Sequence, residues 1–274
     1  MDEKGKILDI FPTEEAGDNI ECLEGWLCPG FVNAHCHIEL SHLKNVIEER
    51  TGLVSFLQQV MTKRDALHSL REAAMQQALI ELHRSGTVAV GDICNTTDSL
   101  SVKTNSPIHW HNFIEVSGFV NNVADFRIQQ LESVYQAFQN HSFPSTLFWR
   151  NTWSPHAPYS VSSNLFEKIN HLTKDQLLSI HNQECAAENE LYINKTGDFL
   201  KLFDHFKINI AEFQPTGKSS LQSCRYPDKS YSRFPSTNQL AEACFQYKYW
   251  HLHIGNNRSK SKRFFSQSQC HPDW

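Results

Sequence analysis

The sequence of 274 residues lacks several features that mark other classes of protein. It has no run of 18 uninterrupted apolar residues and no apolar stretch behind a basic start, so we expect neither a membrane span nor secretion. The eight cysteines show no CxxC spacing and no disulfide-dense pattern, which favours free thiols in a reducing compartment. A net charge of -5 lacks the basic excess of nucleic-acid-binding proteins. We therefore expect a cytoplasmic protein that acts on a small-molecule substrate, without nucleic acid or membrane, and a homo-oligomer is possible.

The last fifth of the chain has few aliphatic residues. Residues 224–274 contain only Leu240, Leu252 and Ile254 as aliphatic side chains larger than alanine. Buried parallel strands are rich in such side chains, so this segment cannot supply them. It carries eight Lys or Arg against three Asp or Glu, a net charge of +5, while the rest of the chain carries -10. We expect an irregular, loosely docked tail.

The rest of the chain alternates between apolar runs and segments with apolar residues three and four positions apart. Residues 5–30 indicate short strands broken by Gly and Pro, a small β leader. The later runs predict strands at 30–36, 86–94, 107–116, 145–153, 176–182 and less clearly 207–213. The segments between them predict helices at 52–63, 68–84, 122–139, 162–173 and 187–205. This alternation favours an α/β fold with a parallel sheet, closed as a barrel or left open.

The strongest local signal is a strand that ends in two histidines, in the segment PGFVNAHCH at 29–37. Alternate side chains of a strand share a face, so His35 and His37 point the same way while Cys36 points into the packing. Two imidazoles at this spacing can chelate one divalent ion. A histidine pair of this kind is more often only a polar strand end, and the next motif favours the metal site.

That second motif is LLSIHNQE at 177–184, in which an apolar run ends in His181 and Glu184 follows three residues later. A glutamate that does not bind the metal can move protons between water, substrate and leaving amine. The alternative is that Glu184 only stabilises the start of a helix near Ala186.

A third motif, SPHAPYSVS at 154–162, follows another apolar run. Its His156 is a candidate for binding or polarising a substrate, and Ser160 or Ser162 is a candidate cap for the following helix. The alternative is a rigid turn without a chemical role.

The motifs PGFVNAHCHIELSH, SPHAPYSVS and SIHNQE, in this order, resemble the metal-dependent amidohydrolase superfamily. They are similar to its chlorohydrolase and aminohydrolase branch, which includes adenosine-derivative, guanine and cytosine deaminases. The resemblance implies a TIM-type (β/α) barrel, a small β-sandwich built from both chain ends, and one Zn or Fe(II) ion. It also implies roles for single residues: metal ligation by His35, His37 and His181, general acid/base chemistry by Glu184, substrate contact by His156, and pocket lining by Glu39 and His42.

The resemblance stops near residue 223. Family members continue with an apolar strand that ends in a further His and a later strand that ends in Asp-Ser, and the sequence shows neither. His251 and His253 follow an aromatic, lysine-containing stretch and receive no role. We expect that the residues after about 223 come from a shifted reading frame or a truncated gene. The expected organisation is a β leader at 1–28, an incomplete TIM-type barrel at 29–223 and an atypical tail at 224–274.

These residues predict a hydrolase of non-peptide carbon-nitrogen bonds that deaminates an aminated heterocycle such as a purine derivative. The alternative enzyme activities for the same site are hydrolytic dehalogenation and ring-amide hydrolysis. A non-catalytic amidohydrolase remnant is the alternative from another class.

Overall fold

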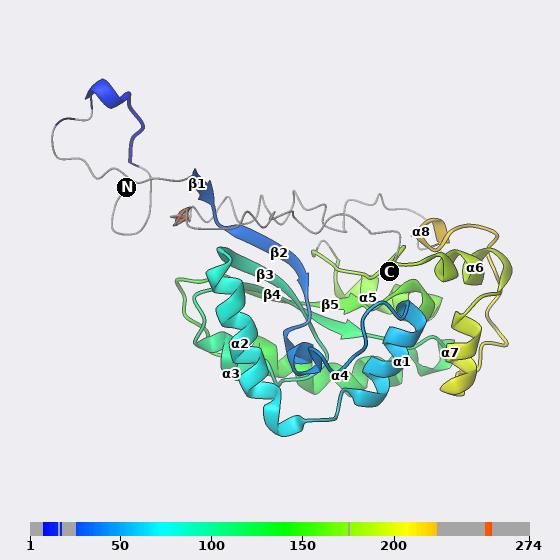
Figure 1. The fold of residues 1–274 in the computed structure, drawn as a ribbon. Coiled ribbons are helices and arrows are strands. Elements are labelled where there is room, and N and C mark those ends of the chain that lie inside the picture. The colour runs from blue at the N-terminus through cyan, green and yellow to red at the C-terminus, as the bar shows by residue number, and fades with distance from the viewer. Residues whose placement is uncertain (1–7, 16, 18–25, 175, 224–249, 254–274) are drawn as a thin grey trace.

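A four-stranded parallel sheet forms the centre of the structure, a computed structural model that describes residues 8–15, 17, 26–174, 176–223 and 250–253. The strands lie in chain order, each beside the next, as Figure 1 shows. They are β2 (Phe31–Cys36), β3 (Thr87–Cys94), β4 (His109–Val116) and β5 (Trp149–Pro155). Four of the predicted strands are therefore confirmed, and so is the α/β class with a parallel sheet.

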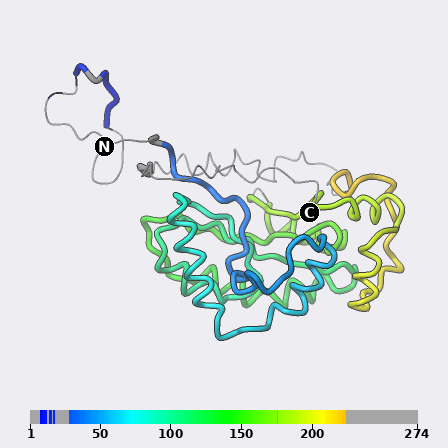
Figure 2. Tube along the Cα trace, viewed as in Figure 1, coloured from blue at the N-terminus to red at the C-terminus, as the bar shows by residue number. Residues whose placement is uncertain are grey.

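Helices alternate with these strands, and Figure 2 traces the chain through them. The α-helices are α1 (Leu53–Lys63), α2 (Arg71–Arg84), α3 (Leu100–Thr104), α4 (Ala124–Gln139), α5 (Ser163–Leu172), α6 (Ala186–Asn194), α7 (Phe199–His205) and α8 (Ser220–Ser223). Short 3-10 helices are η1 (Thr13–Glu15), η2 (Ile38–Leu43), η3 (His68–Leu70), η4 (Asn121–Val123) and η5 (Pro158–Ser160). The helix predicted at 187–205 is divided into α6 and α7, because Lys195 and Gly197 adopt positive φ angles of 54° and 91°.

One face of the sheet packs against α2 to α5. Val90 and Trp110 contact α2 and α3 in one apolar cluster, while Ile114 and Trp153 contact α4 and α5 in another. Every residue of β3 and β4 is buried, and the mostly apolar run of β3 fits a strand covered on both faces. Side chains at the carboxyl ends of the strands, such as His35 and Glu115, form the site described below.

The strand predicted at 176–182 is an extended segment without ladder pairing. It runs along β5, where Ser154 Oγ donates to the Ser179 carbonyl at 2.5 Å and accepts from the Ser179 N–H at 2.9 Å. Thr152 Oγ1 donates to the Leu177 carbonyl at 3.2 Å in the same way. Side-chain hydroxyls of β5 thus replace backbone ladder bonds and bring this segment to the edge of the sheet.

The strand predicted at 207–213 is wrong. Lys207 has a positive φ of 54°, and Ile208, Ile210 and Phe213 pack against the apolar cluster of α6 and α7 instead. The apolar residues of this segment therefore pack against helices and not into the sheet.

A second, two-stranded sheet joins β1 (Trp26–Pro29) antiparallel to β6 (Trp250–His253), with Leu27 opposite Leu252. Most of the predicted leader and tail lies outside the described residues, so the β-sandwich and the irregular tail stay predictions. Within the described ranges the parallel sheet is open from β2 to β5, and closure into a barrel stays a prediction too. None of the helices in this part of the chain combines the length and apolarity that a membrane crossing requires.

Candidate metal centre

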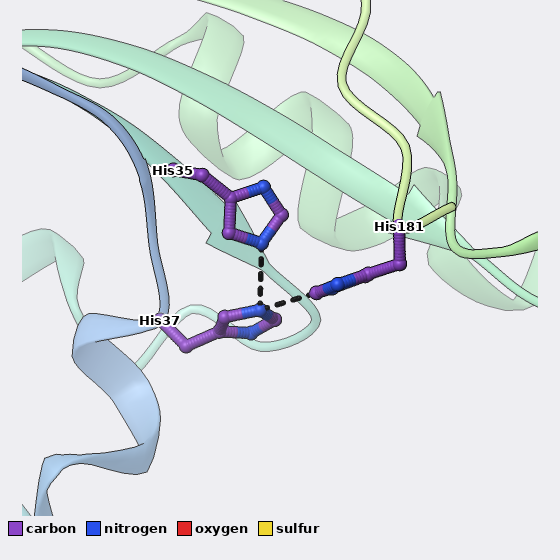
Figure 3. A group of neighbouring side chains, drawn as sticks. All are labelled: His35, His37 and His181. Atoms are coloured by element: carbon purple, nitrogen blue, oxygen red, sulfur yellow. Dashed lines mark hydrogen bonds between the residues drawn. The ribbon is translucent and has the colours of Figure 1, made fainter. Parts of the chain in front are cut away.

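Three histidines meet at the carboxyl edge of the sheet (Figure 3). His35 Nε2 lies 3.1 Å from His37 Nε2, which lies 3.2 Å from His181 Nε2. In a tetrahedral site with metal-nitrogen bonds of about 2.0–2.1 Å, neighbouring nitrogens lie roughly 3.3–3.4 Å apart. The three imidazoles predicted as ligands are therefore spaced as ligands of one divalent ion.

The local fold explains why the first two histidines converge. His35 lies near the end of β2 on the face away from Cys36, and His37 begins the turn into η2. The N–H of Ile38, the next residue, donates to Asp92 Oδ1 at 2.8 Å on the neighbouring strand β3. This bond holds the turn so that the His37 ring returns toward His35.

Two of the three rings are oriented by their other nitrogen. His35 Nδ1 lies 3.0 Å from Ser179 Oγ, and His181 Nδ1 lies 2.8 Å from Glu184 Oε1. A partner at the second nitrogen fixes the tautomer and the orientation of a metal-binding imidazole. His37 Nδ1 is buried, and no partner for it occurs among the described residues.

The surroundings keep two of the imidazoles neutral. Burial and the neighbouring imidazoles of His181 and His37 lower the pKa of His35 to about 3, and burial also lowers the pKa of His37. Burial acts in the same direction on His181, but the hydrogen bond and charge of Glu184, with the charge of Glu115, raise its pKa above the usual value. Below the raised pKa of His181, a metal ion must displace a proton from this ring.

We expect the metal affinity to fall as the pH is lowered through the raised pKa of His181, by about tenfold per pH unit below that pKa. Glu184→Gln removes the carboxylate that raises this pKa, so the fall should begin at a lower pH. Competition titrations with a chelator between pH 5 and 8 measure both curves. Glu190→Gln, an exposed charge change on α6, should behave as the unchanged protein. An unshifted curve for Glu184→Gln would contradict this assignment.

Glu184 faces the histidines rather than capping a helix. Its Oε1 pairs with His181, and its Oε2 accepts the Tyr159 hydroxyl at 3.0 Å. Glu188 takes the helix-start position instead, because its carboxylate accepts the backbone N–H groups of Gln183 and Glu184 at 3.1 and 2.7 Å. The geometry therefore favours the chemical interpretation of Glu184 over the structural one.

His156 lies at the end of β5 beside the triad, with its ring centroid 5.1 Å from that of His181. Its Nδ1 lies 2.5 Å from Ser160 Oγ, and burial lowers its pKa. Ser162 accepts the Leu165 N–H and caps α5, which confirms one of the two predicted capping serines. The His156 ring is thus a neutral, oriented group at the rim, and its contact with a substrate stays a prediction.

Glu39 and His42 have partners within the protein. The Glu39 carboxylate is buried and accepts the N–H groups of Asn95 and Thr96 at 3.0 and 2.9 Å, while Arg64 lies 3.4 Å away. His42 Nε2 lies 2.9 Å from the Arg64 carbonyl. These contacts tie η2 to the loop after β3 and to the end of α1, and substrate contact by either residue stays a prediction.

A cavity of about 950 Å³ adjoins the centre. His37 and Glu184 lie at its wall together with His42, and the rest is lined by residues of η2, the loop 44–52, α1 and α2, both apolar and charged. The cavity gives His42 the position that pocket lining requires, and its size suits a small organic molecule.

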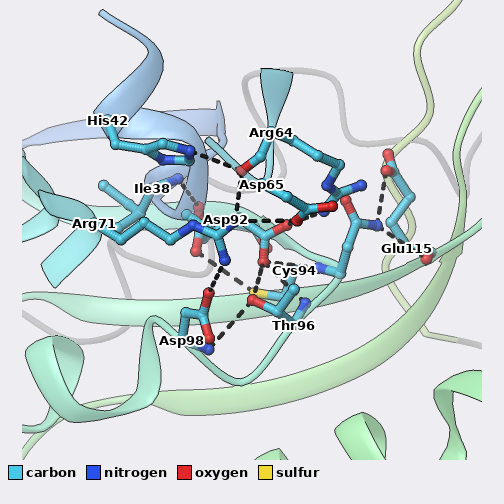
Figure 4. A network of polar contacts seen from close by, with 12 residues as sticks. Ile38, His42, Arg64, Asp65, Arg71, Asp92, Cys94, Thr96, Asp98 and Glu115 are labelled. Carbon is cyan, nitrogen blue, oxygen red and sulfur yellow. Dashed lines mark hydrogen bonds and ion pairs between the residues drawn. The ribbon is translucent and has the colours of Figure 1, made fainter. Parts of the chain in front are cut away.

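Three charged residues near the centre escape the sequence motifs. Glu115, on β4, is buried with its Oε1 3.8 Å from His181 Nε2. Asp92 pairs with the fully buried Lys103 at 2.6 Å. Asp92 and Glu115 are charges within the buried strands β3 and β4, and that is the signal by which a sequence could have indicated them, whereas Lys103 lies on α3. Figure 4 shows Asp92 and Glu115 in a network of polar contacts that also includes His42 and Arg64.

Known proteins resemble this chain over about two thirds to three quarters of its length. No protein-family model matches it. It is 30% identical over 186 residues to the aminodeoxyfutalosine deaminase of Nitratiruptor sp., which covers 66% of this chain and 44% of that protein. It is 28% identical over 182 residues to an adenosine deaminase of Helicobacter pylori, covering 66% and 43%. The chain thus spans less than half the length of these two relatives.

The solved structures that resemble this chain include deaminases as well. The crystal structure of Helicobacter pylori aminofutalosine deaminase, in complex with methylthio-coformycin, superposes with a TM-score of 0.59 and 25% identity, over 71% of this chain and 45% of that one. Guanine deaminase from C. acetobutylicum shares the fold with a TM-score of 0.53 at 16% identity, over 74% and 52% of the two chains. The chain is therefore homologous to deaminases of the metal-dependent amidohydrolase superfamily.

Proposed function

We propose that this chain provides the metal-binding face of a hydrolase that removes an amino group from an aminated heterocycle, a purine derivative in particular. The observation that carries the proposal is the convergence of three imidazole Nε2 atoms. That of His37 lies 3.1 Å from that of His35 and 3.2 Å from that of His181. The two relatives whose names give adenosine and aminodeoxyfutalosine deamination support the substrate class. The chain spans only part of each, so activity and substrate are proposals.

His35, His37 and His181 would hold one Zn or Fe(II) ion. Imidazole suits both metals, and the three facing atoms are all nitrogens. Such an ion, when bound, supplies Lewis acidity that makes water a nucleophile near neutral pH. Ser179 and Glu184 would hold the rings of His35 and His181 in the ligating orientation.

Glu184 would carry the protons. Hydrolytic deamination adds water to a ring carbon and releases ammonia, so one proton must leave the water and one must reach the departing amine. The carboxylate of Glu184 lies beside His181 at the cavity wall, and its pKa is lowered: burial raises it, but the hydrogen bond and charge of His181 outweigh burial. An ionised carboxylate at this place can accept the first proton and donate it in the second step. Tyr159 holds its other oxygen.

The cavity between η2, α1 and α2 would admit the substrate. Its wall reaches His37 and Glu184, so a ring placed there would lie beside the groups that react. His156, whose ring centroid lies 5.1 Å from that of His181, would hydrogen bond a ring substituent.

A release assay tests the proposal directly. Protein loaded with zinc or with Fe(II) under anaerobic conditions is incubated with a panel of aminopurines, their nucleosides and aminopyrimidines, and ammonia is measured. The proposal predicts release from at least one purine derivative and none from the His37→Ala variant. Metal-loaded, folded protein without release from any member would contradict the deaminase and favour the non-catalytic remnant, while release of halide or ring opening would favour the enzyme alternatives.

A further inference from the structure

The turn between His181 and Glu184 has a backbone conformation that few residues adopt. Gln183 lies between them with a positive φ of 62°. This region suits glycine, and a residue with a side chain is strained there unless its surroundings hold it. With this turn, His181 Nδ1 lies 2.8 Å from Glu184 Oε1 while His181 Nε2 faces His37. The orientation of both groups therefore depends on how Gln183 is held.

Glu188, on α6, holds this turn through its carboxylate. Its Oε2 accepts the Gln183 N–H at 3.1 Å, and its Oε1 accepts the Glu184 N–H at 2.7 Å. Ser220 Oγ lies 2.9 Å from Oε2, and Glu188 is 0% exposed. A buried carboxylate is costly unless hydrogen bonds compensate for the lost water. Two of its three partners are backbone N–H groups of the turn, so the turn and the buried carboxylate stabilise each other.

These bonds reach further along the chain than those of a helix cap. The helix α6 begins at Ala186, so Cys185 is its N-cap and Glu188 is its third residue. A glutamate at that position in a capping box accepts the N–H of the N-cap residue itself. Glu188 instead accepts from Gln183 and Glu184, the two residues before the N-cap. Its bonds therefore serve the turn and not only the start of the helix.

We propose that Glu188 is a positioning residue of the metal centre, which holds the strained turn at Gln183 and thereby directs His181 and Glu184. The role rests on the proposed function, because it requires that His181 is a metal ligand. Glu188 acts on the backbone, whereas Tyr159 holds the far end of the Glu184 side chain. Loss of the Glu188 carboxylate should free the turn to relax and should move the His181 ring out of its ligating position.

Zinc affinity tests this role without an activity assay. Glu188→Gln keeps the size of the side chain but replaces one accepting oxygen with an amide group that donates, so one N–H of the turn loses its partner. We expect the zinc Kd to rise about 10- to 100-fold, as for loss of an outer partner of a metal ligand. Glu190→Gln removes an exposed charge from the same helix and should leave the zinc Kd unchanged. Competition against a chromogenic chelator measures all the variants.

Replacement of Gln183 supplies a rescue. The Gln183 side chain is exposed, so Gln183→Gly acts mainly through the backbone. The double variant of Glu188→Gln with Gln183→Gly should return to within about threefold of the Kd of the unchanged protein, because glycine adopts a positive φ without strain. A role of Glu188 confined to stability predicts no such recovery, because glycine adds freedom to the unfolded chain.

Bound Co²⁺ gives a second readout, because its visible absorption depends on the ligands and their geometry. The spectrum should change in Glu188→Gln and return in the double variant. Melting of the metal-free variants shows whether each is folded, and Glu188→Asp, which keeps the charge but shortens the reach, replaces Glu188→Gln if that variant is unfolded.

An unchanged zinc Kd in the folded Glu188 variant would overturn the positioning role and leave the metal site intact. A weaker affinity that Gln183→Gly does not recover would overturn it as well, because Glu188 would then act elsewhere than on the turn. Failure of the unchanged protein to bind zinc would instead refute the proposed metal site itself, and this role with it.

Discussion

Replacing Lys103 with methionine is expected to lower the free energy of unfolding by about 3–5 kcal/mol. The ammonium of Lys103 is fully buried and lies 2.6 Å from Asp92 Oδ2 and 2.7 Å from Asn112 Oδ1. Methionine fills a similar volume but leaves the Asp92 carboxylate buried without its counter-charge. Urea unfolding monitored by circular dichroism measures the loss.

The effect should extend to the metal centre. Asp92 accepts the Ile38 N–H beside His37, so a displaced carboxylate moves the turn that carries this ligand. We expect folded Lys103→Met to bind zinc about 10- to 100-fold more weakly, as for loss of an outer partner of a metal ligand.

Two controls separate the charge pair from general damage. The double variant Lys103→Met with Asp92→Asn removes both charges and should recover much of the stability, because the uncompensated charge is gone. Lys201→Met breaks an exposed pair with Asp198 on α7 and should leave the urea midpoint unchanged. If Lys103→Met unfolds at the midpoint of the unchanged protein, the buried pair does not contribute as described.

Replacing His37 with alanine is expected to raise the zinc Kd by about a hundredfold or more. Structural zinc binding of roughly 10–16 kcal/mol shared by four ligands corresponds to about 3 kcal/mol for each, which is about a hundredfold in Kd. His37 Nε2 lies within 3.2 Å of the Nε2 atoms of both His35 and His181. Its loss leaves two of the three imidazoles, His35 and His181, to hold the ion.

Chelator competition at constant pH measures this change. His171→Ala removes an exposed imidazole at the end of α5 and serves as the matched control, with no expected effect. Melting of His37→Ala without metal shows whether the variant is folded. Zinc binding by His37→Ala at the affinity of the unchanged protein would place the ion elsewhere.

Local spacing explains why the histidines could be predicted. His35 and His37 are separated by one residue at a strand end, and His181 and Glu184 by three, so their shared direction follows from the pattern of a short segment. The strand β3 was predictable because its run TVAVGDIC is mostly apolar and buried throughout, whereas β2 and β5 are only partly buried. The structure adds which strand lies beside which.

Glu115 and Lys103 could not be found in this way. Lys103 reaches Asp92 only because α3 returns over the neighbouring strands β3 and β4, and Glu115 reaches His181 across β5. These contacts depend on strand order, which periodicity does not contain. The segment 176–182 does not form a ladder with β5, because the hydroxyls of Thr152 and Ser154 on β5 hydrogen bond its backbone. The sequence of 176–182 alone does not show this.

X-ray absorption at the zinc edge of the loaded protein tests the central claim most directly. Binding by His35, His37 and His181 predicts a first shell of nitrogen and oxygen only, at about 2.0–2.1 Å, with the outer-shell scattering of three imidazoles. His35→Ala with His37→Ala should abolish that signal. A shell containing sulfur at about 2.3 Å would show that cysteines such as Cys36 or Cys185 hold the ion, and protein that retains no zinc would show that the three nitrogens do not form a site.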